Sequence, residues 1–160
     1  MQAPFRILFL CTGNCCRSQM AEALLRHLGG DRFRACSAGS HPAGFVHPLA
    51  IEAMRRMGIS TEGQYSKSWD ELADVPIDVV LTLCDHAASQ PCPVFPSSQV
   101  KAHWSLPDPA FHVGTDEERL AFAELVARHL RAWIEQLVRL PIDKLSAEQL
   151  KAELDRIPTT

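Results

Sequence analysis

A short apolar segment that leads into a tight turn and then a helix constrains this chain more than any other feature. Residues 5–11 are apolar except for Arg6, which is typical of a strand buried on both faces of a parallel sheet. Residues 12–14 form the turn, and Ser18 then supplies an N-cap type side chain before apolar residues at helical spacing. The start of the chain therefore predicts strand, loop and helix.

The same alternation continues along the sequence. Apolar segments and helical periodicity predict strands at 33–37, 77–83 and 100–104, and helices at 48–57, 66–73 and 115–140. Strands that alternate with helices give an open α/β sheet with helices on both faces and right-handed crossovers. Three prolines within residues 91–96 predict an exposed loop before the last strand.

Length and composition favour one domain. A chain of 160 residues lies within the usual domain size, and Pro141 ends the long helix, so we expect a single catalytic α/β domain over 1–140 and a helical extension over 141–160. The net charge of −3 provides no positive field for nucleic acid or anionic lipid. Without an apolar run long enough for a signal peptide or membrane span, we expect a cytoplasmic monomer, in which six cysteines would not form a disulfide framework.

Cys11 and Arg17 form a C-x5-R motif between the first strand and the first helix. A loop that wraps from a strand to a helix N-terminus turns backbone N–H groups inward, which creates a site for a tetrahedral oxyanion. Gly13 and Asn14 tolerate the positive φ that such a loop needs, and Arg17 can bind two oxygens of the anion. Cys11 would then be a nucleophile that faces the anion, with Ser18 as its hydrogen-bond donor. The alternative is an inert cysteine at a strand end.

Attack on an oxyanion expels an oxygen, which requires a general acid near the site. Asp108 lies in the Leu-Pro-Asp-Pro-Ala segment 106–110, which follows the last predicted strand and returns to the same edge of the sheet. Spacing alone leaves two interpretations open, a catalytic acid and an ordinary Asp-Pro turn.

Three segments, residues 10–23, 36–39 and 103–110, together resemble the arsenate reductases built on the low-molecular-weight tyrosine phosphatase fold. The resemblance covers roughly residues 5 to 140. It implies a Rossmann-like, four-stranded parallel sheet flanked by helices on both faces, with Cys11 as nucleophile and Asp108 as acid. The implied contacts to arsenate or phosphate come from Thr12, Gly13, Asn14, Cys15, Cys16, Arg17 and Ser18.

Cys84 and Cys92 indicate the reductase branch of this family. Their segment resembles the redox segment of the reductases. Phosphatases carry aromatic residues, typically tyrosines, just after Asp-Pro, where this chain has Ala110-Phe111 and its only tyrosine is Tyr65. The resemblance implies reduction of arsenate to arsenite, a detoxification of arsenic, in which Cys84 attacks the Cys11 sulfur and Cys92 then attacks Cys84. Thioredoxin, or else glutaredoxin, would reduce the final disulfide, and no cofactor would be tightly bound. Because eight extended residues span about 27 Å, we expect the intervening loop to be mobile.

Two other functions stay open. In a low-molecular-weight protein tyrosine phosphatase, water would hydrolyse a thiophosphate at Cys11, and a reductase with the same loop would keep some phosphatase activity. A non-catalytic oxyanion-binding module would keep the loop without turnover. Zinc is disfavoured because the cysteine spacing lacks a short ligand pair. Cys15 could form an off-pathway disulfide with Cys11 under oxidation, and Cys36 is expected in the core.

Some reductases of this family bind potassium beside the anion loop. The matching positions here would be Asn14, Glu22 and Ser37, and no other metal site is expected. Lys67 is expected close to the same place, where its ammonium group could replace the ion.

Overall fold

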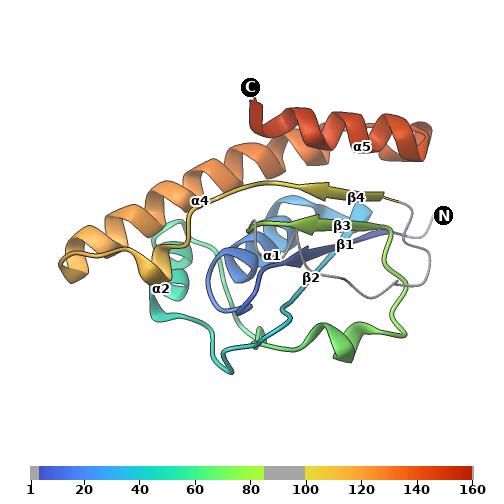
Figure 1. Cartoon of the computed structure of the whole chain (residues 1–160). Helices are drawn as coiled ribbons and strands as arrows, with labels where there is room; N and C mark the ends of the chain where they lie inside the picture. The colour runs from blue at the N-terminus through green and yellow to red at the C-terminus, as the bar shows by residue number, and fades with distance from the viewer. Residues whose placement is uncertain (1–3, 85–99, 160) are drawn as a thin grey trace.

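Four parallel strands form one sheet, in the order β2-β1-β3-β4 (Figure 1). The computed structural model describes residues 4–84 and 100–159 of the chain. The strands are β1 (Phe5–Leu10), β2 (Phe33–Ala38), β3 (Val79–Thr82) and β4 (Val100–His103). Leu8 pairs with Cys36 on one side and with Val80 on the other, so β1 is a central strand. The four-stranded parallel sheet is confirmed, with strand bounds within about two residues of those expected.

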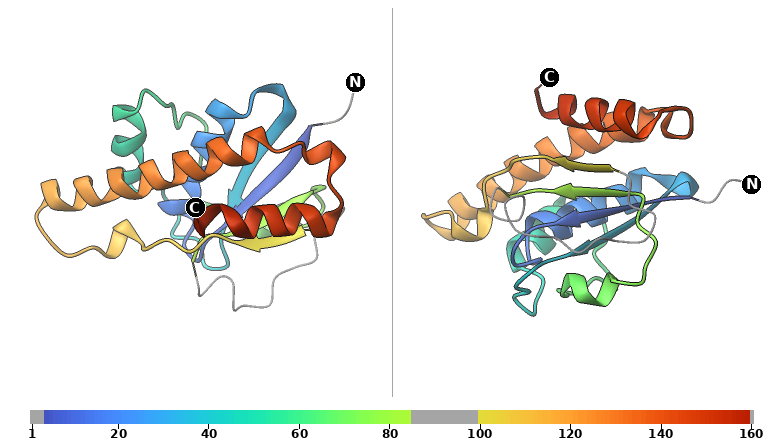
Figure 2. Two further views of the ribbon diagram at one scale, coloured as in Figure 1. Left: turned by 90° about the horizontal axis from the view of Figure 1, so that it is seen from above. Right: turned by 45° about the vertical axis from the view of Figure 1, so that its right-hand side comes forward.

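The two faces of the sheet are covered unequally (Figure 2): four α-helices share the larger core, and a short 3₁₀ helix packs on the opposite face. The helices α1 (Arg17–Leu28), α2 (Pro48–Arg56), α4 (Asp116–Arg139) and α5 (Ala147–Arg156) all contribute to a core with Ile7 and Phe9 of β1. Leu8 and Leu10 point to the opposite face, since side chains alternate along a strand. The short 3₁₀ helix η2 (Trp69–Leu72) packs there, so the expectation of helices on both faces is confirmed.

The segment 66–73 was expected to be one helix, but only η2 within it is helical. The backbone stays extended at Ser68, which forms a parallel bridge with Gly39 and accepts a hydrogen bond from the Asp70 amide at its Oγ. Pairing with the end of the sheet thus replaces the first helical turn.

Helix α4 follows its sequence signals closely. Thr115 and Glu118 form the capping box that the spacing predicts, and the helix ends at Arg139, with Leu140 as its C-cap before Pro141. Helix α4 packs mainly against α1 and α2. Its buried side chains are Ala123, Val126, Ala127, Leu130, Ile134 and Leu137. The remaining short 3₁₀ helices are η1 (Gly30–Arg32), η3 (Pro109–Phe111), η4 (Ile142–Lys144) and η5 (Ile157–Thr159).

The segment after Pro141 packs against the same core. Its helix α5 lies beside β4 (Figure 1), and the indole of the fully buried Trp104 donates a hydrogen bond to the Leu154 carbonyl (2.8 Å). Lys151 Nζ donates to the Lys101 carbonyl of β4 (3.1 Å). In the described part of the chain, no helix is both long and apolar enough to cross a membrane.

Candidate active site

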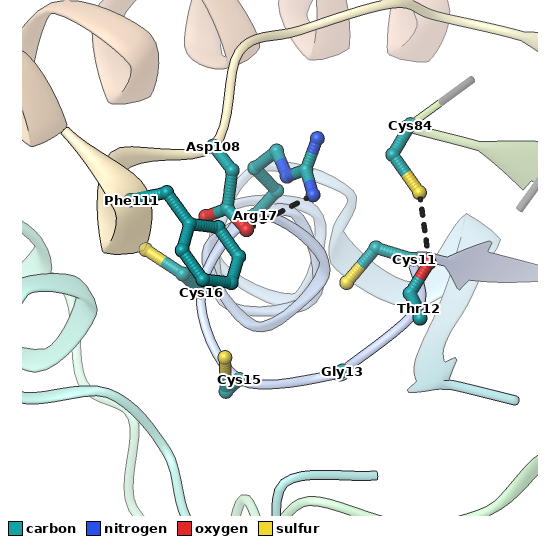
Figure 3. A pocket seen from close by; sticks show the side chains of 9 residues that line it. All are labelled: Cys11, Thr12, Gly13, Cys15, Cys16, Arg17, Cys84, Asp108 and Phe111. Atoms are coloured by element: carbon teal, nitrogen blue, oxygen red, sulfur yellow. Dashed lines mark hydrogen bonds and ion pairs between the residues drawn. The ribbon is translucent and has the colours of Figure 1, made fainter. Parts of the chain in front are cut away.

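A pocket of about 360 Å³ opens at the carboxyl ends of β1 and β3, where the sequence predicted a site (Figure 3). It brings together residues from the loop after β1, the end of β3 and the loop after β4. The residues that line it are Cys11, Thr12, Gly13, Cys15, Cys16, Arg17, Cys84, Asp108 and Phe111. Residues from distant parts of the sequence therefore converge at one edge of the sheet, as expected for an open α/β fold.

The loop between β1 and α1 presents its amides to this pocket because its carbonyl groups are bonded on the outside. The backbone N–H groups of the 41–47 segment donate to the carbonyls of Thr12, Gly13 and Cys15, at 2.9, 2.9 and 2.7 Å. The N–H groups of residues 12–17 have no hydrogen-bond partner within the described chain. Inward amides at the N-terminus of α1 form a concave anion site.

Asn14 and Gly39 make this loop conformation accessible. Asn14 has φ of 46°, while Gly13, for which the sequence allowed the same conformation, does not adopt a positive φ. The Asn14 side chain is fully buried, and its Oδ1 accepts from the Lys67 amide (2.9 Å). A Cβ atom on Gly39 would lie 2.5 Å from the Thr12 carbonyl oxygen, so only glycine lets β2 end so close to the loop.

Cys11 is buried at the base of the pocket, with its Sγ 2.9 Å from Ser18 Oγ. The expectation that Ser18 is an N-cap is wrong, because α1 begins at Arg17 and its N-cap residue is Cys16. Ser18 lies in the first turn, and its hydroxyl serves the Cys11 sulfur instead. The predicted pairing of these two residues is present.

Arg17 is oriented by the loop after β4. Its Nη1 donates to the Leu106 carbonyl (2.8 Å) and its Nη2 to Asp108 Oδ2 (3.2 Å). Its Nε is buried and has no partner among the described residues. An unsatisfied charged donor of this kind is costly unless a ligand oxygen completes it, so the side chain is arranged to bind an anion.

Asp108 both caps a turn and faces the pocket. Its Oδ1 accepts from the Ala110 amide (3.0 Å) at the start of η3, and its Oδ2 contacts Arg17. Figure 3 shows Asp108 and Cys11 on either side of Arg17. The two interpretations of the Asp-Pro segment, turn and acid, are therefore compatible in one residue.

Cys84 follows β3 and reaches the same pocket. It is 6% exposed and packs against Cys11, and the Thr12 hydroxyl forms a hydrogen bond with its Sγ (3.5 Å). The structure thus places two of the three predicted redox thiols together. Cys92, and the loop expected to be mobile, lie outside the described residues.

Three further thiols have raised pKa values. Burial, followed by the charges of Cys11 and Asp108, raises the pKa of Cys15 to about 11, although Cys15 lines the pocket. Burial also raises the pKa of Cys16, and it raises that of Cys36 to about 12. These thiols are neutral at physiological pH and are weak nucleophiles there.

The positions expected for potassium surround a lysine. Ser37 Oγ donates to Glu22 Oε1 (2.7 Å), and Lys67 Nζ donates to the Ser37 carbonyl (3.0 Å) and lies 3.9 Å from Glu22 Oε1. Since Asn14 binds the Lys67 amide, one buried lysine occupies the site, which does not fit an additional cation. The described residues contain no cluster of three or more His, Cys, Asp or Glu that could hold a metal ion.

Sequence reasoning missed the outer support of the anion loop. The 41–47 segment acts through backbone amides, which leave no side-chain pattern to detect. The sequence also suggested no role for Phe111, which lines the pocket and is 83% exposed.

Comparisons with known proteins agree with this geometry. The model of the family "Low molecular weight phosphotyrosine protein phosphatase" matches residues 6–153. The arsenate reductase of Halalkalibacterium halodurans is 46% identical over 115 residues, which cover 72% of this chain and 81% of that protein. The arsenate reductase of Bacillus subtilis is 42% identical over 120 residues, covering 75% and 85% respectively.

Solved structures give the same picture. An arsenate reductase in the phosphate binding state has a TM-score of 0.67 and 29% identity, and the match covers 84% of this chain and 96% of that one. The thioredoxin-dependent arsenate reductase of Corynebacterium glutamicum has a TM-score of 0.58 and 29% identity, with coverage of 84% and 64%.

Proposed function

The chain belongs to the low molecular weight phosphotyrosine protein phosphatase family, and within this family we propose that it is an arsenate reductase. The reaction would use Cys11, Cys84 and Cys92 in a thiol–disulfide cascade. The observation that carries this proposal is the contact between Cys84 and Cys11 in one oxyanion pocket. A phosphatase needs no second thiol there, because water completes its reaction.

Arsenate is a tetrahedral oxyanion, and the pocket offers donors for its oxygens. The inward N–H groups of residues 12–17 and the unpartnered Nε of Arg17 are the donors in question. Such preorganised donors favour an anion whose charge grows during attack by a thiolate. Phosphate has the same shape and would compete for this pocket.

In the first step, the Cys11 sulfur attacks arsenic(V). An S–As bond forms and one As–O bond breaks, and Asp108 gives a proton to the departing oxygen, which leaves as water. Ser18 holds the sulfur in place through its hydroxyl (2.9 Å). The product is a Cys11 thiol adduct of arsenic(V).

In the second step, the Cys84 thiolate attacks the Cys11 sulfur. An S–S bond forms and the S–As bond breaks, so the bonding pair stays on arsenic, which leaves as arsenite. The Thr12 hydroxyl is positioned to bind the Cys84 sulfur during this attack. Two thiols are oxidised by two electrons and arsenic(V) is reduced to arsenic(III).

Cys92 would then attack Cys84 and release Cys11, a step that rests on the sequence alone. An external dithiol must reduce the resulting disulfide, and we propose thioredoxin, with glutaredoxin as the alternative. The comparison with a thioredoxin-dependent relative supports this choice. A cytoplasmic location and a monomeric state are part of the same proposal. In place of potassium, we assign the buried cation near the loop to Lys67.

The test couples arsenate reduction to NADPH oxidation through thioredoxin and its reductase. Wild type is compared with Cys84→Ser and Cys92→Ser, with Cys36→Ser as a matched control away from the pocket. We expect the first two variants to lose multiple turnover with arsenate and to keep any hydrolysis of phenyl phosphate. Equal arsenate turnover in all four proteins would refute the cascade.

Phosphatase activity is the second candidate, and Phe111 at the mouth of the pocket is the observation that favours it. An exposed aromatic ring there can stack on an aryl phosphate. Hydrolysis of phenyl phosphate without arsenate turnover would establish this candidate. Cys11→Ser distinguishes both enzymes from a non-catalytic module. An enzyme would lose its activity and still bind the anion, whereas a module has no activity to lose.

A further inference from the structure

Arg119, in the first turns of α4, reaches back to the loop that carries Asp108. Its Nη2 donates to the Ala110 carbonyl (3.2 Å). Its Nε is buried without a partner among the described residues. Fixing a long charged side chain in this way costs conformational entropy and solvation free energy, so we ask which interaction offsets this cost.

Ala110 is the link between Arg119 and the proposed acid. While its carbonyl accepts from Arg119, its amide donates to Asp108 Oδ1 (3.0 Å). The far end of the same turn is also fixed to α4, because the His112 ring stacks on Phe122 with 4.1 Å between ring centroids. The turn 108–112 is thus anchored to α4 at two points.

The charge of Arg119 acts on the region that holds Asp108. Burial and then Arg119 lower the pKa of His47, while Asp108 raises it, so the guanidinium and the carboxylate influence the same imidazole. His47 helps to support the anion loop, because its backbone N–H donates a hydrogen bond to the Cys15 carbonyl (2.7 Å). Arg119 is therefore electrostatically close to the proposed catalytic centre without lining the pocket.

We propose that Arg119 is a positioning residue that keeps the Asp108 carboxyl directed at the departing oxygen, acting through Ala110. Arg17 cannot do this alone, because its guanidinium has to bind the oxyanion while it contacts Asp108. An anchor independent of Arg17 keeps the acid in place when the anion enters. The inference rests on the proposed reductase, and it extends equally to hydrolysis at the same site.

The test compares Arg119→Met, which keeps the apolar stem, with Arg119→Lys, which keeps a donor and the charge. Arg131→Met is the matched control, since Arg131 lies on the same helix and pairs with the half-exposed Glu135. We expect Arg119→Met to lower kcat/KM for arsenate at least about tenfold, with less than about twofold change in the inhibition constant of phosphate. Arg119→Lys should recover part of the loss, and the control should match wild type.

A double variant separates positioning from a general structural effect. On an Asp108→Asn background, Arg119→Met should cause no further loss, because the group that it positions is already gone. The same factor of loss on both backgrounds, or a parallel loss of phosphate binding, would overturn the proposal. If wild type does not reduce arsenate, the proposed function fails by itself. The Arg119 comparison is then made with phenyl phosphate, whose leaving oxygen also needs Asp108.

Discussion

The Sγ atom of Cys11 lies 2.9 Å from the Oγ atom of Ser18. Asn14 Nδ2 donates to the same Oγ (2.8 Å), which leaves the Ser18 hydroxyl proton free for another partner. The oxygen and nitrogen of the Asn14 side-chain amide cannot be exchanged, since the oxygen accepts from the Lys67 backbone N–H. The Ser18 proton is therefore available for the Cys11 sulfur, and against a thiolate, which has no proton, Ser18 is the donor. The hydroxyl is thereby prepared for an anionic nucleophile.

Ser18→Ala should lower kcat/KM for arsenate by about 10- to 100-fold, because a hydrogen bond to a charged group contributes about 1.5–3 kcal/mol. The inhibition constant of phosphate should change little, since the loop amides and Arg17 are intact. Steady-state kinetics at saturating thioredoxin measure both values, with the exposed Ser60→Ala as control. Unchanged kinetics would mean that the Cys11 sulfur reacts without this bond.

Lys67→Met should make the protein sensitive to potassium. Wild type should have the same arsenate kinetics and stability in potassium, sodium and choline chloride at one ionic strength, because the Lys67 ammonium group already lies beside Ser37 and Glu22. The variant leaves the buried Glu22 without its cation, which should lower the free energy of unfolding by about 3 kcal/mol. Potassium should restore part of this loss.

Urea unfolding and arsenate kinetics in the three salts check this prediction, and Lys144→Met serves as an exposed control. A potassium requirement in wild type would contradict it.

Cys15 should react slowly with iodoacetamide at pH 7, although it lines the pocket. Burial raises its pKa to about 11, so about one thiol in 10,000 is ionised at pH 7. Its labelling rate should increase about tenfold per pH unit up to pH 10. Peptide mass mapping measures this rate. In Cys11→Ser the rate should increase only modestly, since burial is the larger cause of the shift.

Rapid labelling of Cys15 at pH 7 would contradict the raised pKa. It would also make the expected off-pathway disulfide with Cys11 a fast competitor of the cascade, which the neutral thiol otherwise disfavours.

The parts of the site that could be predicted are those governed by local sequence and strand direction. The run from Phe5 to Arg17 defines strand, loop and helix, and the carboxyl ends of parallel strands bring Cys84 to Cys11. Contacts across long sequence distances could not be predicted. The 41–47 segment acts through amides, and Arg119 reaches Ala110 by a side-chain conformation that no periodicity encodes. Ser18 has N-cap chemistry, but its hydroxyl is used by a tertiary partner instead.

Leu154→Ala should show that α5 is part of the cooperative core. Leu154 is fully buried, and such truncations cost about 2–5 kcal/mol. The free energy of unfolding in urea should fall by this amount in a single transition, while kcat/KM stays unchanged. Glu148→Ala, at an exposed position of the same helix, should change stability by less than about 0.5 kcal/mol. A loss below about 1 kcal/mol for Leu154→Ala would mean that residues 141–159 unfold separately.

The position of α5 also has a consequence for self-association. An edge strand usually offers free carbonyls and amides to any extended chain that approaches it. Here Lys151 takes the Lys101 carbonyl of β4, and the helix lies alongside the strand. A second molecule cannot add a strand at the β4 edge without displacing α5, so this edge of the sheet is protected against the edge-to-edge pairing that starts aggregation.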